Sequence, residues 1–363
     1  MLRMLTALAA LLLLGAAGCA RTADPDAPAP PSQTTSRAVI VDADADGAIV
    51  LDGDQAYRGV RRDGTTAWRR PAGEQAPMAV ACAARCPDAV LSGSVRSFTK
   101  ADVADPRPRL LLDGRAHPLA GVTGHHRRVL TAAGLRDFVA AVGDGDRWRL
   151  ELHRGDRPPT RLPVDGSLPT WQESPDGRLA LLTVTGQGTG APGSRARWFT
   201  RQPGGWRPAG TTIPVAGVDA CVADDGRALL LGQSPAILHR DGRLEPVTDL
   251  EHAGACALAA SGGIVAELAQ LQDGRARARL RAFDAGGSVV WRRDLPAEVA
   301  VTADPTASRA AYLADGALQE IDLRTGQAPP PLPGVLAARY DGAGGLVTVG
   351  LDHTLTWRSP AGR

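Results

Sequence analysis

Lysine is almost absent from this chain of 363 residues: Lys100 is the only lysine among 41 basic side chains. Acidic side chains number 39, so the formal net charge is only +2. Chains that bind nucleic acid usually carry a strong basic excess, and this balance predicts no nucleic-acid partner. The preference for arginine, together with abundant alanine and glycine, is typical of a high-GC genome and favours an actinobacterial source.

The motifs of several common catalytic sites are missing as well. The sequence contains no HExxH pair, no P-loop and no GxSxG elbow, since residues 232–236 read GQSPA. Residues 188–193 spell GxGxxG, but they lie between expected antiparallel strands, whereas a dinucleotide loop joins a parallel strand to a helix. No adjacent cysteine pair of the quinoprotein-dehydrogenase type occurs, so their cofactor is not expected. The sequence therefore favours a protein that is not an enzyme.

The first 18 residues are typical of a signal peptide. Arg3 precedes an apolar run, residues 5–14, which is about half of the roughly 20 residues that a spanning helix needs. The small residues after it end in Gly18-Cys19 and resemble the lipobox of bacterial lipoproteins. The resemblance implies cleavage before Cys19, a diacylglycerol on its sulfur and attachment to the outer face of the cell membrane. An ordinary secretory signal with a chance cysteine is the alternative.

The segment after Cys19 has almost nothing to bury. Residues 20–37 (ARTADPDAPAPPSQTTSR) are rich in Pro, Ala, Ser and Thr and predict a disordered tether that lifts the remaining chain off the membrane. Residues 38–363 then form the folded domain. An all-β chain of this length often forms one domain, and we expect a monomer.

Four further cysteines, Cys82, Cys86, Cys221 and Cys256, fit an exported protein. An even number outside the cytoplasm suggests two disulfides, with three possible connectivities. Cys82 and Cys86 flank a turn, so they could pair across a hairpin. Cys221 and Cys256 occupy matching strands of consecutive repeats, so they could join neighbouring units. A zinc site would need CxxC or histidine spacing that this sequence lacks.

A repeated pattern of four short strands organises the folded part, and residues 218–250 show it most clearly. Its four apolar segments are residues 220–223, 228–231, 236–239 and 244–247. Turn signals separate them, among them Asp241-Gly242, a pair that favours tight hairpin turns. No segment has the length or the period of a helix. One four-stranded meander has too little core to be stable alone, so it must pack against copies of itself.

Eight such units follow one another at a spacing of about 40 residues, the period of a propeller blade. They cover residues 38–71, 77–121, 122–164, 168–213, 218–250, 251–296, 297–333 and 334–363. The pattern predicts an all-β fold, a single β-propeller of eight four-stranded antiparallel blades, and a seven-bladed ring is the alternative. The eighth unit shows only three strands. The fourth would come from residues just before Ala38, or from residues 38–42 at the expense of the first blade.

Two groups of motifs resemble known propellers. SPDGRLALLTV (residues 174–184) resembles the repeat of WD40-like and TolB-type propellers. DGTTAWRRP around Trp68 and GGSVVWRRD around Trp291 resemble the last strand of quinoprotein-type blades. The resemblance covers most of residues 38–360 and implies an architecture rather than an activity. The seven tryptophans fall mostly on third or fourth strands, where they are expected to fill the gaps between blades.

One face of the ring is the candidate binding surface. Two long insertions, residues 97–107 and 186–195, fall between second and third strands, on the face that also receives the blade-to-blade connections. The candidate residues on those connections are His125, His126, Arg127, Arg128, Arg70, Glu251, His252 and Arg293. Convergent polar groups at the mouth of a ring favour binding, and solvated loops are the alternative.

A candidate calcium loop opens the folded part. Asp42, Asp44 and Asp46, followed by Gly47, match the start DxDxDG of such loops. Val50 and Gly53 stand where later ligands are needed, so an acidic hairpin turn is the favoured interpretation and Ca²⁺ the alternative. No other cofactor is expected.

These observations lead to two functional hypotheses. The first is a membrane-anchored, extracytoplasmic lipoprotein whose propeller binds a protein or cell-envelope partner without catalysis. The second is an enzyme of hydrolase or lyase type with its site at the mouth of the propeller channel, which ionisable groups from three or more blades would favour.

Overall fold

Short β-favouring segments separated by turns fold as strands throughout the described chain. The computed structural model describes residues 38–359 apart from positions 55, 72–77, 84, 93–108, 113, 120–126, 135–136, 145–146, 186–192, 204, 218, 232–234, 248–249, 251–252, 271–275, 296–298 and 307. These residues form 30 β-strands. Within them there is no helix of the length and hydrophobicity that crossing a membrane requires.

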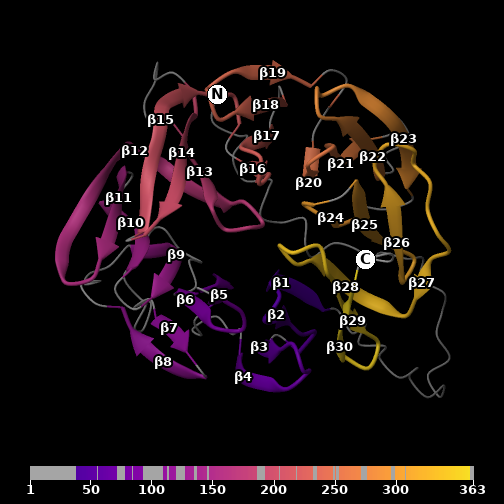
Figure 1. Cartoon of the computed structure of the whole chain (residues 1–363), viewed down its shortest axis with the longest axis horizontal. Coiled ribbons are helices and arrows are strands. Elements are labelled where there is room, and N and C mark those ends of the chain that lie inside the picture. Colours follow the sequence, from indigo (N-terminus) through magenta and orange to yellow (C-terminus); the bar gives the residue numbers. More distant parts are fainter. Residues whose placement is uncertain are drawn as a thin grey trace, which may run out of the picture. The chain divides into compact units, whose positions relative to one another are not determined.

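The strands group into antiparallel blades in chain order (Figure 1). Blade 1 contains β1 (Val39–Ala43), β2 (Gly47–Leu51), β3 (Ala56–Arg61) and β4 (Thr66–Pro71). Blade 2 contains β5 (Met78–Cys82), β6 (Ala89–Ser92), β7 (Arg109–Leu112) and β8 (Arg115–Pro118). Blades 3 and 4 contain β9 (Arg127–Gly134), β10 (Asp137–Asp144), β11 (Arg147–Arg154), β12 (Arg157–Glu173), β13 (Leu179–Thr185), β14 (Arg195–Gln202) and β15 (Gly205–Pro214).

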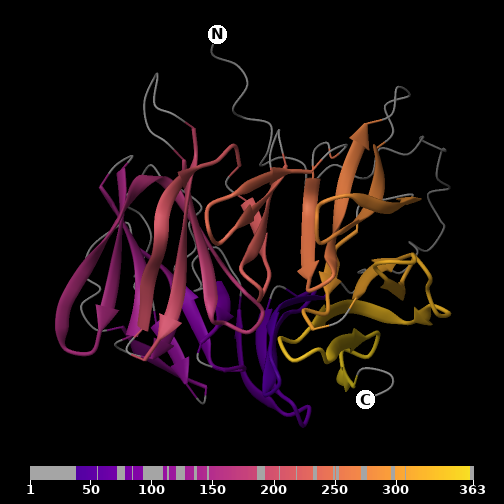
Figure 2. The same cartoon turned by 45° about the horizontal axis from the view of Figure 1, so that its top comes forward.

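The second half of the chain continues the same meander. Blade 5 contains β16 (Asp219–Val222), β17 (Arg227–Leu231), β18 (Ala236–His239) and β19 (Leu244–Pro246). Blade 6 contains β20 (Ala253–Ala259), β21 (Gly262–Gln270), β22 (Ala276–Asp284) and β23 (Val289–Leu295). Blade 7 contains β24 (Val301–Ala303), β25 (Arg309–Ala314), β26 (Ala317–Asp322) and β27 (Leu332–Pro333), and blade 8 contains β28 (Val335–Tyr340), β29 (Leu346–Gly350) and β30 (Leu355–Arg358). Figure 2 shows the up-and-down course of these strands, most clearly in the orange blade 6.

Strand β12 belongs to two blades at once. Its first part pairs with β11, with Leu150 opposite Leu162, and its last part pairs with β13, with Trp171 opposite Leu182. The 17-residue strand is therefore the fourth strand of blade 3 and the first strand of blade 4. This is why seven strands, β9 to β15, form one continuous sheet.

The hydrophobic core lies between blades. Each of eight clusters of buried side chains joins one blade to the next. The cluster that closes the ring packs Ala48 and Val50 of blade 1 against Val347 and Val349 of blade 8. A blade thus buries both of its faces only when two neighbours are present, which is the physical reason for the repeat. The eight-bladed propeller predicted from the sequence is confirmed, and the seven-bladed alternative is wrong.

Tryptophans tie neighbouring blades together. Their indole N–H groups donate to backbone oxygens of the following blade: Trp68 to Pro87 at 2.7 Å, Trp198 to His239 at 3.3 Å and Trp291 to Leu323 at 2.8 Å. Trp357 of blade 8 donates to Asp44 of blade 1 at 3.4 Å and so spans the closure of the ring. These side chains occupy third or fourth strands, as predicted.

Two local expectations need correction. A glycine pair is a turn signal, so Gly262-Gly263 favours the first turn of the sixth unit, but both glycines lie in β21, opposite Ala259 and Leu258, and the turn is at residues 260–261. Residues 38–42 were one candidate for the last strand of the eighth blade. They instead lead into and form most of β1, the first strand of blade 1, and blade 8 has three strands in the described part of the chain.

Candidate functional site

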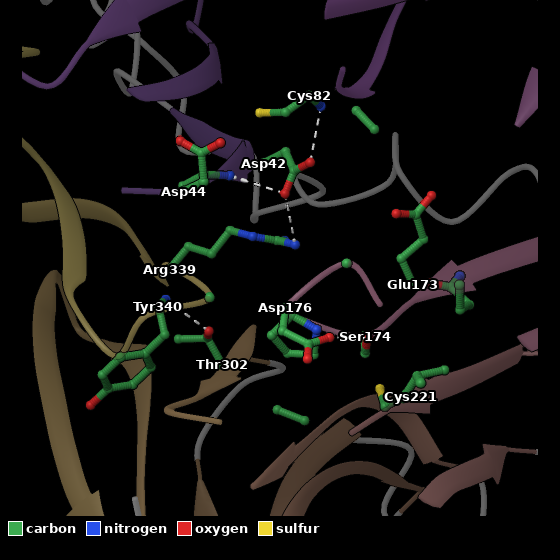
Figure 3. A pocket seen from close by; sticks show the side chains of 18 of the residues that line it. Asp42, Asp44, Cys82, Glu173, Ser174, Asp176, Cys221, Thr302, Arg339 and Tyr340 are labelled. Atoms are coloured by element: carbon green, nitrogen blue, oxygen red, sulfur yellow. Dashed lines mark hydrogen bonds and ion pairs between the residues drawn. The ribbon is translucent and has the colours of Figure 1, made fainter. Parts of the chain in front are cut away.

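The first strands of all eight blades surround one cavity, which we call the channel cavity. It has a volume of about 630 Å³, in the range of small-molecule sites. Its walls come from β1, β5, β9, β12, β16, β20, β24 and β28, with Arg201 of β14 added from the third strand of blade 4. Figure 3 draws 18 of the side chains that line it and labels ten of them.

The hydrogen bonds of the first turns reveal which residues of these strands are equivalent. In blades 1, 4, 7 and 8 a residue that starts the turn donates its backbone N–H across it: Asp44 to Gly47, Ser174 to Leu179, Asp304 to Arg309 and Asp341 to Gly345. In blade 5 Ala223 makes the same bond to Arg227. The residues that donate these hydrogen bonds therefore occupy equivalent positions in the five blades, and the first strands can be aligned on them.

The residue two positions before each of these turn residues has a side chain that reaches the channel cavity. This ring of positions carries polar groups in blades 1, 4, 7 and 8, namely Asp42, Gln172, Thr302 and Arg339, and the disulfide-bonded Cys221 in blade 5. Because alternate residues of a strand face opposite sides, the next residues, among them Ala43, Val222 and Ala303, are buried in the cores between blades. The channel cavity is thus polar at one level of the ring.

An ion pair joins blades 8 and 1 at this level. A terminal guanidinium nitrogen of Arg339 lies 3.3 Å from Oδ1 of Asp42, and the two side chains remain 43% and 26% exposed. The other oxygen of Asp42 accepts a hydrogen bond from the backbone N–H of Cys82 in blade 2 at 3.0 Å. Figure 3 shows both contacts.

The carboxylates of the predicted calcium loop cap turns. Oδ1 of Asp44 accepts the backbone N–H groups of Asp46 at 2.7 Å and Gly47 at 3.0 Å, and Oδ2 accepts that of Cys86 at 2.7 Å. Burial raises the pKa of Asp44, and these hydrogen bonds oppose the rise. In the described part of the chain no three His, Cys, Asp or Glu residues are placed to hold a metal ion. The geometry is that of an acidic hairpin turn which also fastens blade 1 to blade 2.

Both disulfides suggested by the sequence are present. Cys82 and Cys86 are bonded across the first turn of blade 2, with Cα atoms 5.0 Å apart. Cys221 and Cys256 are bonded between β16 and β20, with Cα atoms 5.9 Å apart, so they join blades 5 and 6 in the wall of the channel cavity.

Glu173 is a site residue that the sequence analysis did not select. Its carboxylate lies where the other blades place Ala43, Val222 and Ala303, and Oε1 accepts the indole N–H of Trp171 at 3.0 Å. Burial raises the pKa of Glu173, while the side-chain hydrogen bonds of Thr131 and Trp171 oppose the rise. A carboxylate at a position that is apolar in other units is the sequence signal that would have found it.

The turn at residues 174–177 closes one end of the channel cavity. It belongs to blade 4, yet the backbone of Gly342 in blade 8 is so near that a Cβ there would overlap the carbonyl oxygen of Pro175. On the other side, the backbone N–H of Asp176 donates to Oδ1 of Asp224 in blade 5 at 2.9 Å. This turn of blade 4 thus contacts the neighbouring blade 5 and, across the axis, blade 8.

The carboxyl groups of Asp176 and Asp224 interact, and the charge of Asp176 affects the pKa of Asp224. Burial raises the pKa of Asp224 to about 6, the hydrogen bond from the Asp176 backbone opposes the rise, and the charge of Asp176 adds to it. In the unfolded chain the pKa of Asp224 is that of an ordinary aspartate, 3.8. The folded state therefore holds more protons between these two values, and this pair contributes less stability as the pH rises through that window.

Replacing Asp224 by asparagine should remove this pH dependence. We expect Asp224→Asn to stabilise the protein at pH 7 by about 1 kcal/mol, a figure reduced from the full shift because the group is partly exposed. Thermal unfolding of the wild type and the variant at pH 5 and pH 7 measures the effect. Asp241→Asn, in an exposed turn of the same blade, is the matched control. If the stability of the wild type and of Asp224→Asn depended on pH in the same way, this would contradict the raised pKa of Asp224 in the folded protein.

The predicted binding-face residues are only partly placed. Arg70 is in β4 and Arg293 in β23, so both are strand residues rather than loop residues. Arg70 donates to the backbone oxygen of Gly114 in blade 2, and Arg293 donates to the Tyr312 hydroxyl at 2.8 Å in blade 7. Both arginines therefore bridge blades, and the prediction that they lie on connecting loops is wrong.

For the remaining binding-face candidates the structure describes no side-chain contacts. Arg127 and Arg128 begin β9, and His125, His126, Glu251 and His252 lie outside the described residues. The two insertions do fall between second and third strands, β6 and β7 in blade 2 and β13 and β14 in blade 4, as predicted. Most of their residues also lie outside the described part.

Comparisons with known proteins yield structural neighbours only. No protein-family model and no curated protein matches the chain. The WD40 propeller domain of Doa1 is similar at 10% identity and a TM-score of 0.38, over 90% of this chain and 94% of that one. A eukaryotic initiation factor is similar at 11% identity and a TM-score of 0.48, over 84% and 77%. Hydrazine synthase of Kuenenia stuttgartiensis is similar at 10% identity and a TM-score of 0.40, over 93% and 99%. Similarity at this level carries no functional information.

Two properties of the channel cavity limit its chemistry. No histidine lines it in the described part of the chain. Its buried hydroxyl, Ser174, donates to Oδ1 of Asp176 at 2.6 Å and accepts the backbone N–H of Leu179 at 3.0 Å, which is the geometry of a turn cap. The Ser174 hydroxyl is therefore held in a turn cap in this structure.

Proposed function

We propose that this protein is a lipid-anchored, extracytoplasmic β-propeller that acts as a monomeric binding module for a protein or cell-envelope partner. The observation that carries the proposal is the pair of disulfides in a domain that follows a lipobox-like Gly18-Cys19. Disulfides persist in oxidising compartments, and a lipid on Cys19 would place the propeller in such a compartment at the membrane surface.

Metabolic labelling tests the anchor. Cells that express the wild-type chain and are fed a palmitate analogue should yield labelled protein, and Cys19→Ala should remove the label because the acceptor sulfur is gone. When the same cells are fractionated, the wild type should be found in the membrane fraction and Cys19→Ala in the soluble fraction. Label that persists on Cys19→Ala would refute lipidation at this residue.

Affinity capture tests the binding role. The intact chain, immobilised and exposed to the native cell envelope, should retain a partner that a variant lacking residues 97–107 does not retain, because that insertion is on the predicted binding face. A Cys19→Ala chain with the insertion intact is the control for the anchor. Retention of the same partner by the deletion variant would contradict the role of the insertion.

One observation favours an enzyme as the second candidate. The Asp176 and Asp224 pair includes a carboxyl group whose pKa of about 6 suits general acid–base catalysis. An activity with a pH limb near this value that Asp224→Asn abolishes would favour a hydrolase or lyase over a binding module.

A further inference from the structure

The ion pair in the channel cavity has unused hydrogen-bonding capacity. A guanidinium offers five N–H donors, and in the described part of the chain the side chain of Arg339 contacts only Asp42. The Arg339 side chain is 43% exposed, and it lines the channel cavity. A planar fork of free donors is suited to a carboxylate, which accepts two parallel hydrogen bonds.

Asp42 supplies the opposite charge beside it. Its two oxygens accept the backbone N–H groups of Ala43 and Cys82 and contact Arg339, which leaves one carboxylate with further lone pairs at the cavity. An ammonium group fits there because it donates and does not accept. The cavity therefore presents a cation and an anion side by side, 3.3 Å apart.

The rest of the wall is compatible with a small, partly apolar molecule. Gln172, across the ring in blade 4, has a side-chain amide without a partner in the described part of the chain. The Thr302 hydroxyl accepts the backbone N–H of Tyr340 at 3.1 Å and keeps its own hydrogen to donate. Aliphatic side chains form part of the remaining wall, among them Val41, Ala81, Ala220, Ala257 and Val301, beside the charged groups of Asp44, Glu173, Asp176 and Arg201.

We propose that the channel cavity binds a small zwitterion, a compound with an ammonium and a carboxylate on the same or neighbouring carbons, as in an aliphatic amino acid. The carboxylate binds Arg339, the ammonium binds Asp42, and the aliphatic part lies against the alanines and valines. The inference deepens the proposed binding role by naming a ligand class for the channel, and it is independent of the lipid anchor.

A ligand with only one charge fits less well. An anion bound at Arg339 lies beside Asp42, and three further carboxylates, of Asp44, Glu173 and Asp176, line the same cavity together with the guanidinium of Arg201. A cation bound at Asp42 meets the guanidinium 3.3 Å away. A zwitterion satisfies both members of the pair, and its net charge of zero avoids the repulsion that either ion alone encounters.

Calorimetric titration of the purified full chain tests the proposal. The probes are glycine, L-alanine and L-leucine, with isoamylamine and 4-methylpentanoate as analogues of leucine that each lack one charge. We expect leucine to bind, and each analogue to bind at least about tenfold more weakly, because each lacks one of the two charged hydrogen-bonding groups. Absence of heat with all three amino acids, or equal binding of either analogue, would overturn the proposal.

Variants assign the binding to the ion pair. Arg339→Gln should weaken leucine binding about tenfold or more, and Arg339→Lys should fall between, because it keeps the charge and loses the fork. Arg324→Gln, at an exposed turn of blade 7, is the charge-matched control and should bind as the wild type does. Unchanged affinity in Arg339→Gln would place the ligand elsewhere and overturn the assignment. Loss of envelope capture with leucine binding intact would instead count against the proposed function alone.

Discussion

Replacing Trp198 by alanine should lower the free energy of unfolding by about 4 kcal/mol, in the range measured for large aromatic truncations in cores. Trp198 is 1% exposed and packs in the core between blades 4 and 5 with Leu181, Leu230 and Leu238. Truncation leaves a cavity between the blades and deprives the His239 carbonyl oxygen of the indole N–H that bonds it at 3.3 Å. Chemical denaturation followed by circular dichroism measures the loss.

Two further variants separate packing from hydrogen bonding. Trp198→Phe keeps most of the buried area and loses the indole N–H, so it should cost clearly less than Trp198→Ala. Trp291→Ala, at a half-exposed position in blade 6 with a comparable bond to Leu323, should also cost less because it opens a smaller cavity. A loss below 1 kcal/mol for Trp198→Ala would mean that blades 4 and 5 repack without this side chain.

Local turn chemistry explains how much of the fold could be predicted from sequence. In blade 5 the four expected segments match β16 to β19 to within a residue or two at each end. The Asp-Gly pairs that set these bounds place Gly226 and Gly242 at φ values of +86° and +93°, which glycine adopts without strain. Such signals act between neighbours in the chain, so the repeat and the number of blades follow from the sequence.

The candidate site depends on contacts that no local signal encodes. Asp42 and Arg339 come from the first and last blades, and they become neighbours only because the ring closes. Predicting the contact between these two residues from sequence requires both the number of blades and the position of each residue along its strand. The local spacing of Asp42 predicts an acidic hairpin turn, with a calcium ligand as the alternative, whereas its partners include a distant guanidinium as well as two backbone N–H groups.

The arginines chosen for a binding face show a second limit. Arg70 and Arg293 end the two conspicuous Trp-Arg-Arg strings, and an exposed cation at the end of a strand is typical of a binding loop. In the fold each strand continues to Pro71 and Leu295, which keeps both guanidinium groups beside the next blade. The strings thus encode blade-to-blade contacts. Conversely, the groups that do converge on the axis are single polar residues in apolar strands, and these are inconspicuous in a linear reading.

Replacing Gly342 by valine should destabilise the protein by about 2 kcal/mol and open the closed end of the channel cavity. Any Cβ at this position overlaps the Pro175 carbonyl oxygen and approaches its carbon to 2.9 Å. Backbone atoms cannot move aside as a flexible side chain can, so the turn at residues 174–177 must shift, at a cost typical of overpacked sites. The shift should break the bond from the Asp176 N–H to Asp224, which is 2.9 Å long in the native fold.

Hydrogen exchange measures this opening directly. Exchange at the Asp176 amide should become at least about tenfold faster in Gly342→Val, since loss of one protecting bond of roughly 1.4 kcal/mol gives that factor. Ala343→Val adds the same branched side chain at the adjacent, exposed position and should leave both stability and exchange unchanged. Native stability and native exchange in Gly342→Val would show that blades 4 and 8 do not touch in solution. If the turn does shift, the channel gains a second entrance beside Asp42 and Arg339, and leucine affinity should fall with the loss of the enclosed cavity.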